Sequence, residues 1–307
     1  MSSNENVPVL PSVGVIGLGV MGKPIARNLL KAAAPVGSAV LVHHRTAGRV
    51  QELLDAGAVF SETPRDLAAK SDVIVLMVPD LPQVEELLDG PNGIVAGIST
   101  PTVLVIGSTS SPDGVRGLDR RLSDATDGLL RVVDAPVSGG EDGAIAGTLS
   151  IMVGGDHDSV DAAWPILSSF GAPVYLGPLG SGEVAKACNQ LIVAATMMAL
   201  GEATVIAARS GLNVGVLLDL LSGGYAGSRM LETRKQRLID EDYSPSGVAK
   251  YMLKDLAFAA AEAKRSSTTA NLLTQVQQSF GDLVERGFGD SDLSVTRAYV
   301  SSLDGMA

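Results

Sequence analysis

The stretch VGVIGLGVMGKPIARNLL, residues 13–30, decides the fold. An apolar run ends in the pattern G-x-G-x-x-G, formed by Gly17, Gly19 and Gly22, and a helical pattern follows at once with Pro24 in its first turn. This order predicts a strand, a tight turn and a helix. The free amides at the start of such a helix face phosphates, so the pattern indicates a dinucleotide site.

Each glycine has an expected part in that site. Gly17 allows the tight turn, Gly19 lets a pyrophosphate approach the backbone, and Gly22 lets the helix pack closely on the sheet. Val20 and Met21 complete the loop and are expected to contribute to cofactor binding. The alternative is a glycine-rich turn that binds no ligand.

The first half of the chain alternates apolar runs with helical patterns. Several runs are apolar throughout, which is typical of a sheet covered by helices on both faces. The alternation predicts repeated βαβ units and a doubly wound sheet. The predicted strands are 13–17, 38–44, 72–78, 102–107, 129–135 and 149–155, with a last short strand within 173–182.

The second half shows no convincing strand beyond residue 182. Helical patterns cover about 183–210, 214–221, 252–264 and 269–285. The sequence therefore predicts an α/β Rossmann-type doubly wound sheet followed by an all-α domain. The expected divisions are a flexible leader at 1–12, the α/β domain at 13–179 and the helical domain at 180–307.

Composition narrows the function. The 23 basic and 34 acidic residues of this 307-residue chain give a net charge of −11, which does not favour nucleic acid or anionic membranes as partners. Cys188 is the one cysteine, which suits a reducing cytoplasm. Residues 1–12 lack the basic and apolar regions of a signal peptide. The longest uncharged run, 187–201, is shorter than the roughly 18 to 20 apolar residues of a membrane span.

The end of the second strand indicates the cofactor. Enzymes that prefer NAD usually carry an acidic residue about 20 residues after the glycines, whereas this chain reads LVHHRTAGR. Arg45 and Thr46 offer donors suited to a 2′-phosphate, so the sequence favours NADP (NADPH) over NAD. The alternative is an exposed loop arginine without a ligand. No metal is expected, because His43 and His44 point to opposite faces of a strand.

Lys186 is unusual for its surroundings. It precedes the uncharged run 187–201, which predicts a helix largely withdrawn from water, where an ammonium group is costly unless it has a use. Lys186, Asn189 and Gln190 are spaced i, i+3 and i+4, so a helix places them in one polar patch. The alternative is a lysine whose ammonium reaches water. Cys188 is expected in the core.

The motifs together resemble the β-hydroxyacid dehydrogenase family, which includes 3-hydroxyisobutyrate dehydrogenase, tartronate semialdehyde reductase and, more distantly, 6-phosphogluconate dehydrogenase. They occur in the family's order over residues 13–264. They are GLGVMG, the VP of Val78 and Pro79, GSTSSP (107–112), DAPVSGG (134–140), GSGEVAKACNQ (180–190) and KDLAFA (254–259).

The resemblance implies a Rossmann domain, here expected to bind NADP because of Arg45, followed by an all-helical domain that begins with a long interdomain helix. The helical domain is expected to serve substrate binding and oligomerisation. It also implies roles for individual residues. Ser108 and Thr109 would lie beside the nicotinamide ribose, with Val78 and Pro79 also on the cofactor. Ser138, Gly139 and Gly140 would cradle the substrate carboxylate and Gln190 would bind substrate. Lys186 would be the proton donor and acceptor, Asn189 a positioning group, and Lys254 a second cation near cofactor or substrate.

The residues themselves are consistent with this chemistry. A serine and two glycines just past a strand expose amides that can converge on an anion, although an ordinary turn has the same composition. As hydride reaches a carbonyl carbon, charge grows on the oxygen, and an ammonium can stabilise it and donate a proton. The expected function is an NADP-dependent oxidoreductase that interconverts a small 3-hydroxy acid and its semialdehyde or oxo acid, with Lys186 as general acid and base.

Two alternatives stay open. Imine reductases share the scaffold but usually lack the helix lysine, and a dinucleotide-binding module without catalysis would share the fold. The chain also departs from relatives that carry an aromatic residue where Gly247 stands; Tyr225, Tyr243 and Tyr251 could rebuild that pocket wall. A shared apolar helical domain predicts a homodimer or homotetramer.

Overall fold

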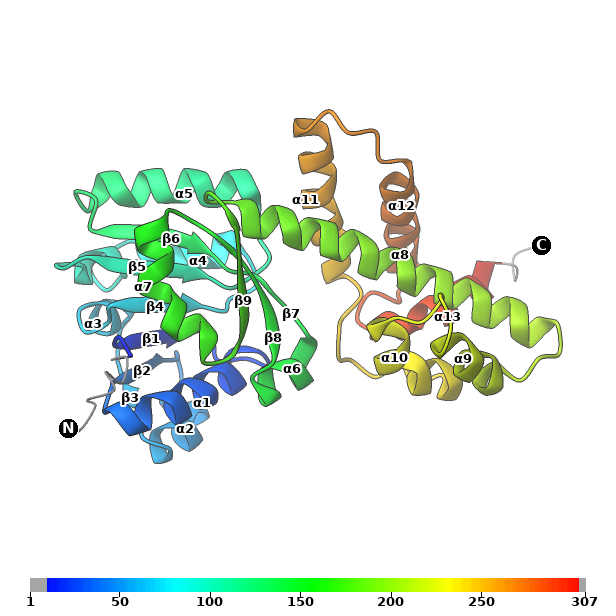
Figure 1. Cartoon of the computed structure of the whole chain (residues 1–307), viewed down its shortest axis with the longest axis horizontal. Helices are drawn as coiled ribbons and strands as arrows, with labels where there is room; N and C mark the ends of the chain where they lie inside the picture. Colours follow the sequence, from blue (N-terminus) through cyan, green and yellow to red (C-terminus); the bar gives the residue numbers. More distant parts are fainter. Residues whose placement is uncertain (1–9, 304–307) are drawn as a thin grey trace, which may run out of the picture. The chain divides into compact units, whose positions relative to one another are not determined.

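The computed structural model describes residues 10–303, so most of the predicted leader lies outside the described residues. The chain divides into two compact units, Met1–Lys186 and Ala187–Ala307. The division falls inside one long helix, α8 (Ser181–Arg209) (Figure 1). The predicted boundary after residue 179 stays a prediction.

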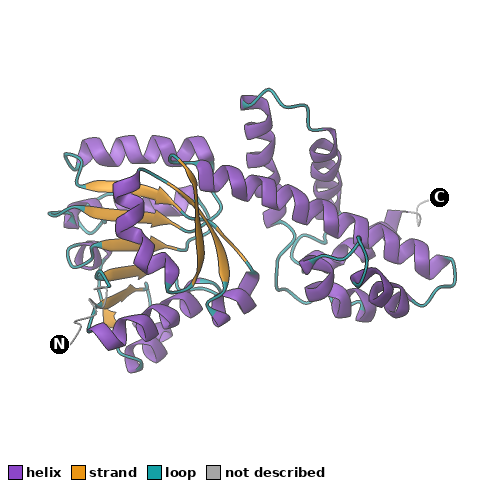
Figure 2. Ribbon diagram, viewed as in Figure 1, coloured by secondary structure: helices purple, strands orange, loops and turns teal. Residues whose placement is uncertain are grey.

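The first unit is built on a nine-stranded sheet of order β3-β2-β1-β4-β5-β6-β8-β7, with β9 paired to β8 (Figure 2). Strands β1 to β6 are parallel to one another, whereas β8 runs antiparallel to β6 and β7. The strands are β1 (Val13–Ile16), β2 (Val40–His43), β3 (Val59–Phe60), β4 (Val73–Leu76), β5 (Thr102–Ile106), β6 (Leu130–Asp134), β7 (Val137–Ser138), β8 (Leu149–Gly154) and β9 (Gly171–Gly177).

Helices cover both faces of this sheet, which confirms the doubly wound prediction. Alternate strand residues point to opposite faces, so Val13 and Val15 pack with α1, α2, α6 and α7, and Leu41 and Ile74 pack with α3, α4 and α5. The helical segments are α1 (Gly22–Ala33), η1 (Ala34–Val36), η2 (Ala47–Val50), α2 (Gln51–Asp55), α3 (Pro64–Ala68), α4 (Leu81–Leu88), η3 (Val95–Gly97), α5 (Pro112–Ala125), α6 (Gly140–Ala146) and α7 (His157–Ser168).

The second unit is helical in its described part, as predicted. Its single β feature is an isolated bridge between Val248 and Asp292. Apolar residues from most of its helices form one core, including Met197, Leu256 and Phe280. After α8 come α9 (Val214–Ser222), α10 (Arg229–Asp240), α11 (Tyr251–Arg265), α12 (Asn271–Glu285), η4 (Leu293–Val295) and α13 (Thr296–Leu303).

Helix α8 is less withdrawn from water than its sequence predicted. Its most apolar 18-residue window has a mean hydropathy of 1.9, yet only 44% of that window is buried. One side packs into the core through Ala194 and Met197, while Cys188 and Ile192 are exposed on another. The prediction of a core position for Cys188 was therefore wrong. By length and composition alone the helix could also cross a membrane, although core helices of soluble proteins meet the same criterion.

Candidate active site

The glycine turn after β1 has the geometry expected of a dinucleotide loop. Gly17 has a φ of 95°, and a Cβ there would lie 2.5 Å from the carbonyl carbon and oxygen of Met77. A Cβ on Gly22 would lie 2.0 Å from the carbonyl oxygen of Gly17. Gly19 differs, because nothing lies within 4 Å of its Cβ position. Two glycines thus close the turn, and the third leaves open space where a pyrophosphate would approach.

The carboxyl ends of the parallel strands gather the other expected cofactor residues. β1 lies between β2 and β4, where the strand order reverses, and such a switch point is where α/β sheets bind ligands. Ser108 is buried after β5, and its hydroxyl donates to the carbonyl oxygen of Val78 after β4. Thr109 is half-buried beside it. In the same unit Val20 is exposed, Met21 is half-buried and Pro79 is exposed.

The end of β2 presents a cation. Arg45 and Thr46 are both exposed, and the Arg45 side chain forms no ion pair with the residues that the structure describes. Glu52 is the first acidic residue after β2, and Arg27 and Lys23 of α1 both pair with it. The hydrogen bond from Arg27 lowers the pKa of Glu52. Glu52 is therefore already engaged and is a poor partner for ribose hydroxyls.

His43 at the end of β2 and His44 just after it have separate partners. His43 is buried, and its Nδ1 lies 2.9 Å from the carbonyl oxygen of Ser61. His44 instead accepts from the backbone N–H of Thr46 at 2.9 Å. Within residues 10–303 no three His, Cys, Asp or Glu side chains come together in a way that could hold a metal.

The Ser138–Gly140 turn follows β7 and opens α6. Gly139 has a φ of 135° and Gly140 a φ of 63°, so both need the conformational freedom of glycine. Nothing lies within 4 Å of a Cβ on Gly140. Consecutive amides in such a turn can converge on an anion, and the open space beside Gly140 gives that anion room.

Lys186 belongs to the same unit as this turn and bonds the residue that precedes it. Its side chain is buried, with 8% of the residue exposed, and its Nζ donates to the carbonyl oxygen of Val137 at 2.8 Å. Val137 directly precedes Ser138, so the ammonium lies beside the predicted carboxylate cradle. The ammonium is thus buried and hydrogen-bonded, unlike the solvated lysine of the alternative. Its catalytic role stays a prediction.

The start of α8 is held by a carboxylate that sequence reasoning did not single out. Asp134 is fully buried at the end of β6, and its two oxygens accept from the N–H groups of Gly180 and Glu183, both at 2.7 Å. A Cβ on Gly154 or Gly182 would lie 2.4 or 2.9 Å from those oxygens. Burial raises the pKa of Asp134, against the lowering effect of these amides. Asp134 is the first residue of the DAPVSGG motif, and this was the signal by which the sequence could have marked it.

A chain of polar contacts runs through the second unit. Asn189 donates to the side-chain oxygen of Gln190 at 2.9 Å, and Gln190 donates to the buried carboxylate of Asp255 at 2.6 Å. Lys254 lies 3.4 Å from the other oxygen of Asp255 and 5.2 Å from the ring centre of Phe258. Gln190 thus supports Asn189, and its direct part in substrate binding stays a prediction. Asp255 is a further residue missed in the sequence.

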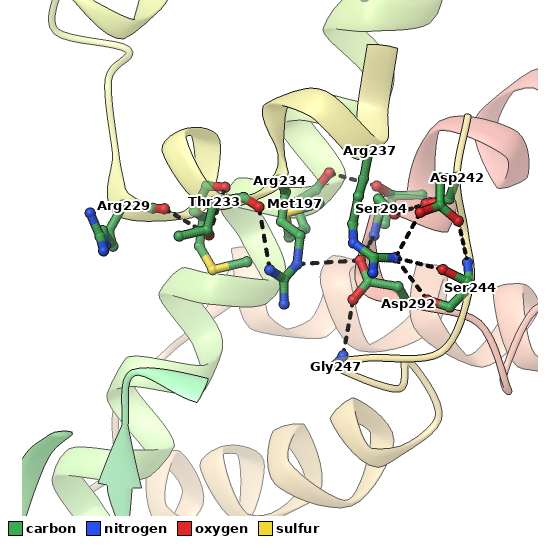
Figure 3. Close-up of polar contacts among 12 residues, drawn as sticks. Met197, Arg229, Thr233, Arg234, Arg237, Asp242, Ser244, Gly247, Asp292 and Ser294 are labelled. Carbon is green, nitrogen blue, oxygen red and sulfur yellow. Dashed lines mark hydrogen bonds and ion pairs between the residues drawn. The ribbon is translucent and has the colours of Figure 1, made fainter. Parts of the chain in front are cut away.

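The neighbourhood of Gly247 is polar (Figure 3). Its backbone N–H donates to Asp292 at 2.9 Å, and the same buried carboxylate lies 3.3 Å from Nε of Arg234. A Cβ on Gly247 would lie 3.4 Å from Nη2 of Arg234. This is an ordinary van der Waals distance, so a Cβ itself would fit at this position. Of the three tyrosines considered for this wall, Tyr243 packs on the helical core, whereas Tyr225 and Tyr251 are exposed.

Comparison with known families agrees with this arrangement. Residues 12–180 match the NAD binding domain of 6-phosphogluconate dehydrogenase, and residues 180–299 match the NAD-binding domain of NADP-dependent 3-hydroxyisobutyrate dehydrogenase. The chain belongs to the β-hydroxyacid dehydrogenase family. It is an oxidoreductase that acts on hydroxyl groups with a nicotinamide dinucleotide cofactor.

Relatives in this family match along nearly the whole chain. The 2-hydroxy-3-oxopropionate reductase of Escherichia coli is 37% identical over 297 residues, which cover 96% of this chain and 98% of the relative. The NAD-dependent L-serine dehydrogenase of Pseudomonas aeruginosa is 32% identical, covering 94% and 97%. The crystal structure of a 3-hydroxyisobutyrate dehydrogenase from Salmonella typhimurium has a TM-score of 0.83 at 28% identity, covering 94% and 99%.

Imine reductases share the fold at lower similarity. The enzyme from Myxococcus stipitatus is 17% identical, with a TM-score of 0.62. The more similar dehydrogenases and reductase of the previous paragraph place this chain among 3-hydroxyacid dehydrogenases of the 3-hydroxyisobutyrate dehydrogenase and tartronate semialdehyde reductase type.

Proposed function

We propose that this dehydrogenase uses NADPH to interconvert a small 3-hydroxy acid and its semialdehyde or oxo acid, with Lys186 as general acid and base. The observation that carries the proposal is the 2.8 Å contact from Lys186 to Val137, which puts a buried ammonium beside the Ser138–Gly140 turn. A substrate carboxylate held by that turn would have its reacting carbon near the ammonium.

The protein's part in the reaction is position and proton transfer. When bound, the nicotinamide supplies or accepts the hydride. The Ser138–Gly140 amides bind the carboxylate and fix the reacting carbon. Lys186 donates a proton to the carbonyl oxygen as charge grows there, and takes the hydroxyl proton in the opposite direction. The roles of Asn189 as a positioning group and of Lys254 as a second cation remain those that the family resemblance implies.

The preference for NADPH rests on Arg45. An arginine can bind a 2′-phosphate with two parallel N–H donors, and the first acidic residue after β2, Glu52, is engaged by Arg27 and Lys23. Gly17, Gly19 and Gly22 fit the pyrophosphate shared by both cofactors, so they do not discriminate between them. The 2′-phosphate contact would therefore decide the choice.

Steady-state assays on a panel of substrates test the proposal. The panel contains small 3-hydroxy acids, L-serine and the corresponding semialdehydes, each with NADPH or NADP⁺ and with NADH or NAD⁺, followed by nicotinamide absorbance. We expect turnover of at least one 3-hydroxy acid pair, with higher kcat/KM for the phosphorylated cofactor. A cyclic imine is assayed beside the panel, and its turnover without turnover of any 3-hydroxy acid would instead support the imine reductase alternative.

We further propose that the helical unit associates with a second copy of the chain, as a homodimer or homotetramer. The exposed side of α8 carries Ile192 and Ile206, and α9 adds Val216 and Leu220, each more than 60% exposed. Apolar patches of this kind on a soluble enzyme mark interaction surfaces. Light scattering at several concentrations would give the oligomeric state, and a monomer throughout would refute the proposal. The cytoplasmic location stays a prediction.

A further inference from the structure

Glu183 is a buried acid that the proposed chemistry does not use directly. It lies in the first turn of α8 and is 1% exposed. One oxygen of its carboxylate accepts a hydrogen bond from the backbone N–H of Ser110 at 2.9 Å, and Ser110 is itself buried. The two residues are 73 positions apart in the sequence. A buried carboxylate is costly unless it is well bonded, so its position here calls for a specific partner.

The N-terminus of α8 suits this acid. The amides of a first helical turn carry partial positive charge, which stabilises an anion there. The backbone N–H of Glu183 also donates to Asp134 at 2.7 Å, so both ends of the residue are fixed. Glu183 is therefore held by Asp134 and in turn holds Ser110.

Ser110 connects this contact to the expected cofactor loop. It directly follows Ser108 and Thr109, and its hydroxyl lies 3.4 Å from the carbonyl oxygen of Ser108. The Ser108 hydroxyl donates to Val78 after β4. Lys186 lies three residues beyond Glu183, about one helical turn away. The Glu183–Ser110 bond is thus a direct link between the turn that carries Lys186 and the loop after β5.

We propose that Glu183 is a positioning residue that fixes the Ser108–Ser110 loop against the first turn of α8, and so sets where Lys186 stands relative to the nicotinamide ribose. This inference rests on the proposed function. The part of Glu183 that matters is the carboxylate oxygen that accepts the hydrogen bond from Ser110. Without it, the buried N–H of Ser110 has lost its partner and the loop shifts to find another.

Three variants separate the acceptor from the charge. Glu183→Gln keeps an oxygen that can accept from Ser110, whereas Glu183→Met keeps a similar volume without an acceptor. Glu202→Gln removes an exposed acid from the same helix and is the control. We expect Glu183→Gln and Glu202→Gln to keep kcat within about threefold of wild type, a change of less than 1 kcal/mol. Glu183→Met should lose about 10- to 100-fold, the scale expected of a displaced catalytic group.

The Lys186→Met background distinguishes positioning from general damage to the fold. If Glu183 acts through Lys186, adding Glu183→Met to Lys186→Met should lower the residual rate no further. A full additional loss in the double variant would overturn the proposal. So would wild-type kcat in Glu183→Met, or a loss in Glu183→Gln as large as that in Glu183→Met. Glu183→Ala repeats the comparison if the methionine variant does not fold.

Amide hydrogen exchange tests the same contact without turnover. The Ser110 amide should exchange faster in Glu183→Met and stay protected in Glu183→Gln. Equal protection in both variants would show that the hydrogen bond from Ser110 to Glu183 does not hold the loop in place. This readout does not depend on the substrate. If wild type turns over no 3-hydroxy acid, the proposed function is wrong. The exchange experiment still decides whether Glu183 holds the Ser110 amide.

Discussion

Arg45 is the side chain on which cofactor choice depends. In Arg45→Ala we expect NADPH binding to weaken by about 1.5 to 3 kcal/mol, the contribution of a hydrogen bond to a charged group. NADH binding should change little, because NADH has no 2′-phosphate. Titration of both cofactors by fluorescence measures this. Arg49→Ala removes another exposed arginine of the same segment and serves as the control. Equal losses for NADPH and NADH would contradict the assignment.

Gly19 and Gly17 should respond differently to a side chain, although both belong to one motif. Gly19→Val adds a side chain into open space, so the melting temperature should hold while NADPH affinity falls at least about tenfold. Gly17→Ala forces a side chain at a φ of 95° and within 2.5 Å of backbone, so it should lower the free energy of unfolding by at least about 1 to 2 kcal/mol. Thermal unfolding and NADPH titration measure the two effects. If Gly19→Val binds NADPH normally, the pyrophosphate does not pass there.

At the scale of elements, the N-terminus of α8 depends on Asp134. In Asp134→Asn an amide NH₂ would face one of the two N–H donors, so we expect a loss of about 1 to 3 kcal/mol in unfolding free energy and a lower kcat. Asp156→Asn is the matched control, because Asp156 caps α7 by accepting from Ser159 at 3.0 Å. Asp156→Asn keeps an oxygen that can accept from Ser159, so it should change stability little and leave kcat unchanged, whereas Asp134→Asn should lose both. Normal kcat in Asp134→Asn would show that α8 needs no such anchor.

The stability lost in Asp134→Asn should also depend on pH. Because burial raises the pKa of Asp134, the folded protein binds its proton more tightly than the unfolded chain. The contribution of Asp134 to stability is therefore largest below its ordinary pKa and falls as pH rises through the folded value. Urea unfolding of wild type and variant across acidic pH gives the difference, which should shrink as pH increases. A difference that grows with pH would mean that the amide bonds outweigh burial.

Elements with a strong local pattern could be predicted from the sequence. The strand, glycine turn and helix at 13–30 carry their own signals, and all three were found. Strands β3 and β7 were missed because two-residue strands have no periodicity of their own. Helix α10 was missed because its sequence, RMLETRKQRLID, is mostly polar. Its buried residues are Leu231 and Leu238, which are too few to give a helical pattern.

Contacts between distant segments could not be predicted. Lys186 and the Ser138 turn were each identified from local patterns, but the bond from Lys186 to Val137 spans 49 positions. Asp134 meets Gly180 across 46 positions. Such pairs depend on how the sheet brings strand ends together, and no spacing rule gives them. This is also why the buried acids Asp134, Glu183 and Asp255 were missed, although each lies in or next to a motif that the sequence did mark.

At the scale of the whole molecule, Lys186 stands where the first unit ends and the helical unit begins. The first unit also holds the glycine turn and the Ser138–Gly140 turn, and α8 continues from Lys186 into the helical unit. The central claim is that the ammonium moves a proton. Lys186→Met keeps most of the apolar stem and removes the charge, so folding and NADPH binding should survive.

Steady-state rate, melting temperature and NADPH affinity measured on one preparation of Lys186→Met test this claim most directly. General acid catalysis contributes about 10²- to 10⁴-fold, and the lost stabilisation of the oxyanion adds to it. We therefore predict a folded variant that binds NADPH and turns over at least about 100-fold more slowly than wild type. A folded variant that binds NADPH and keeps more than about a tenth of the wild-type rate would contradict the account, because that loss corresponds to less than about 1.4 kcal/mol.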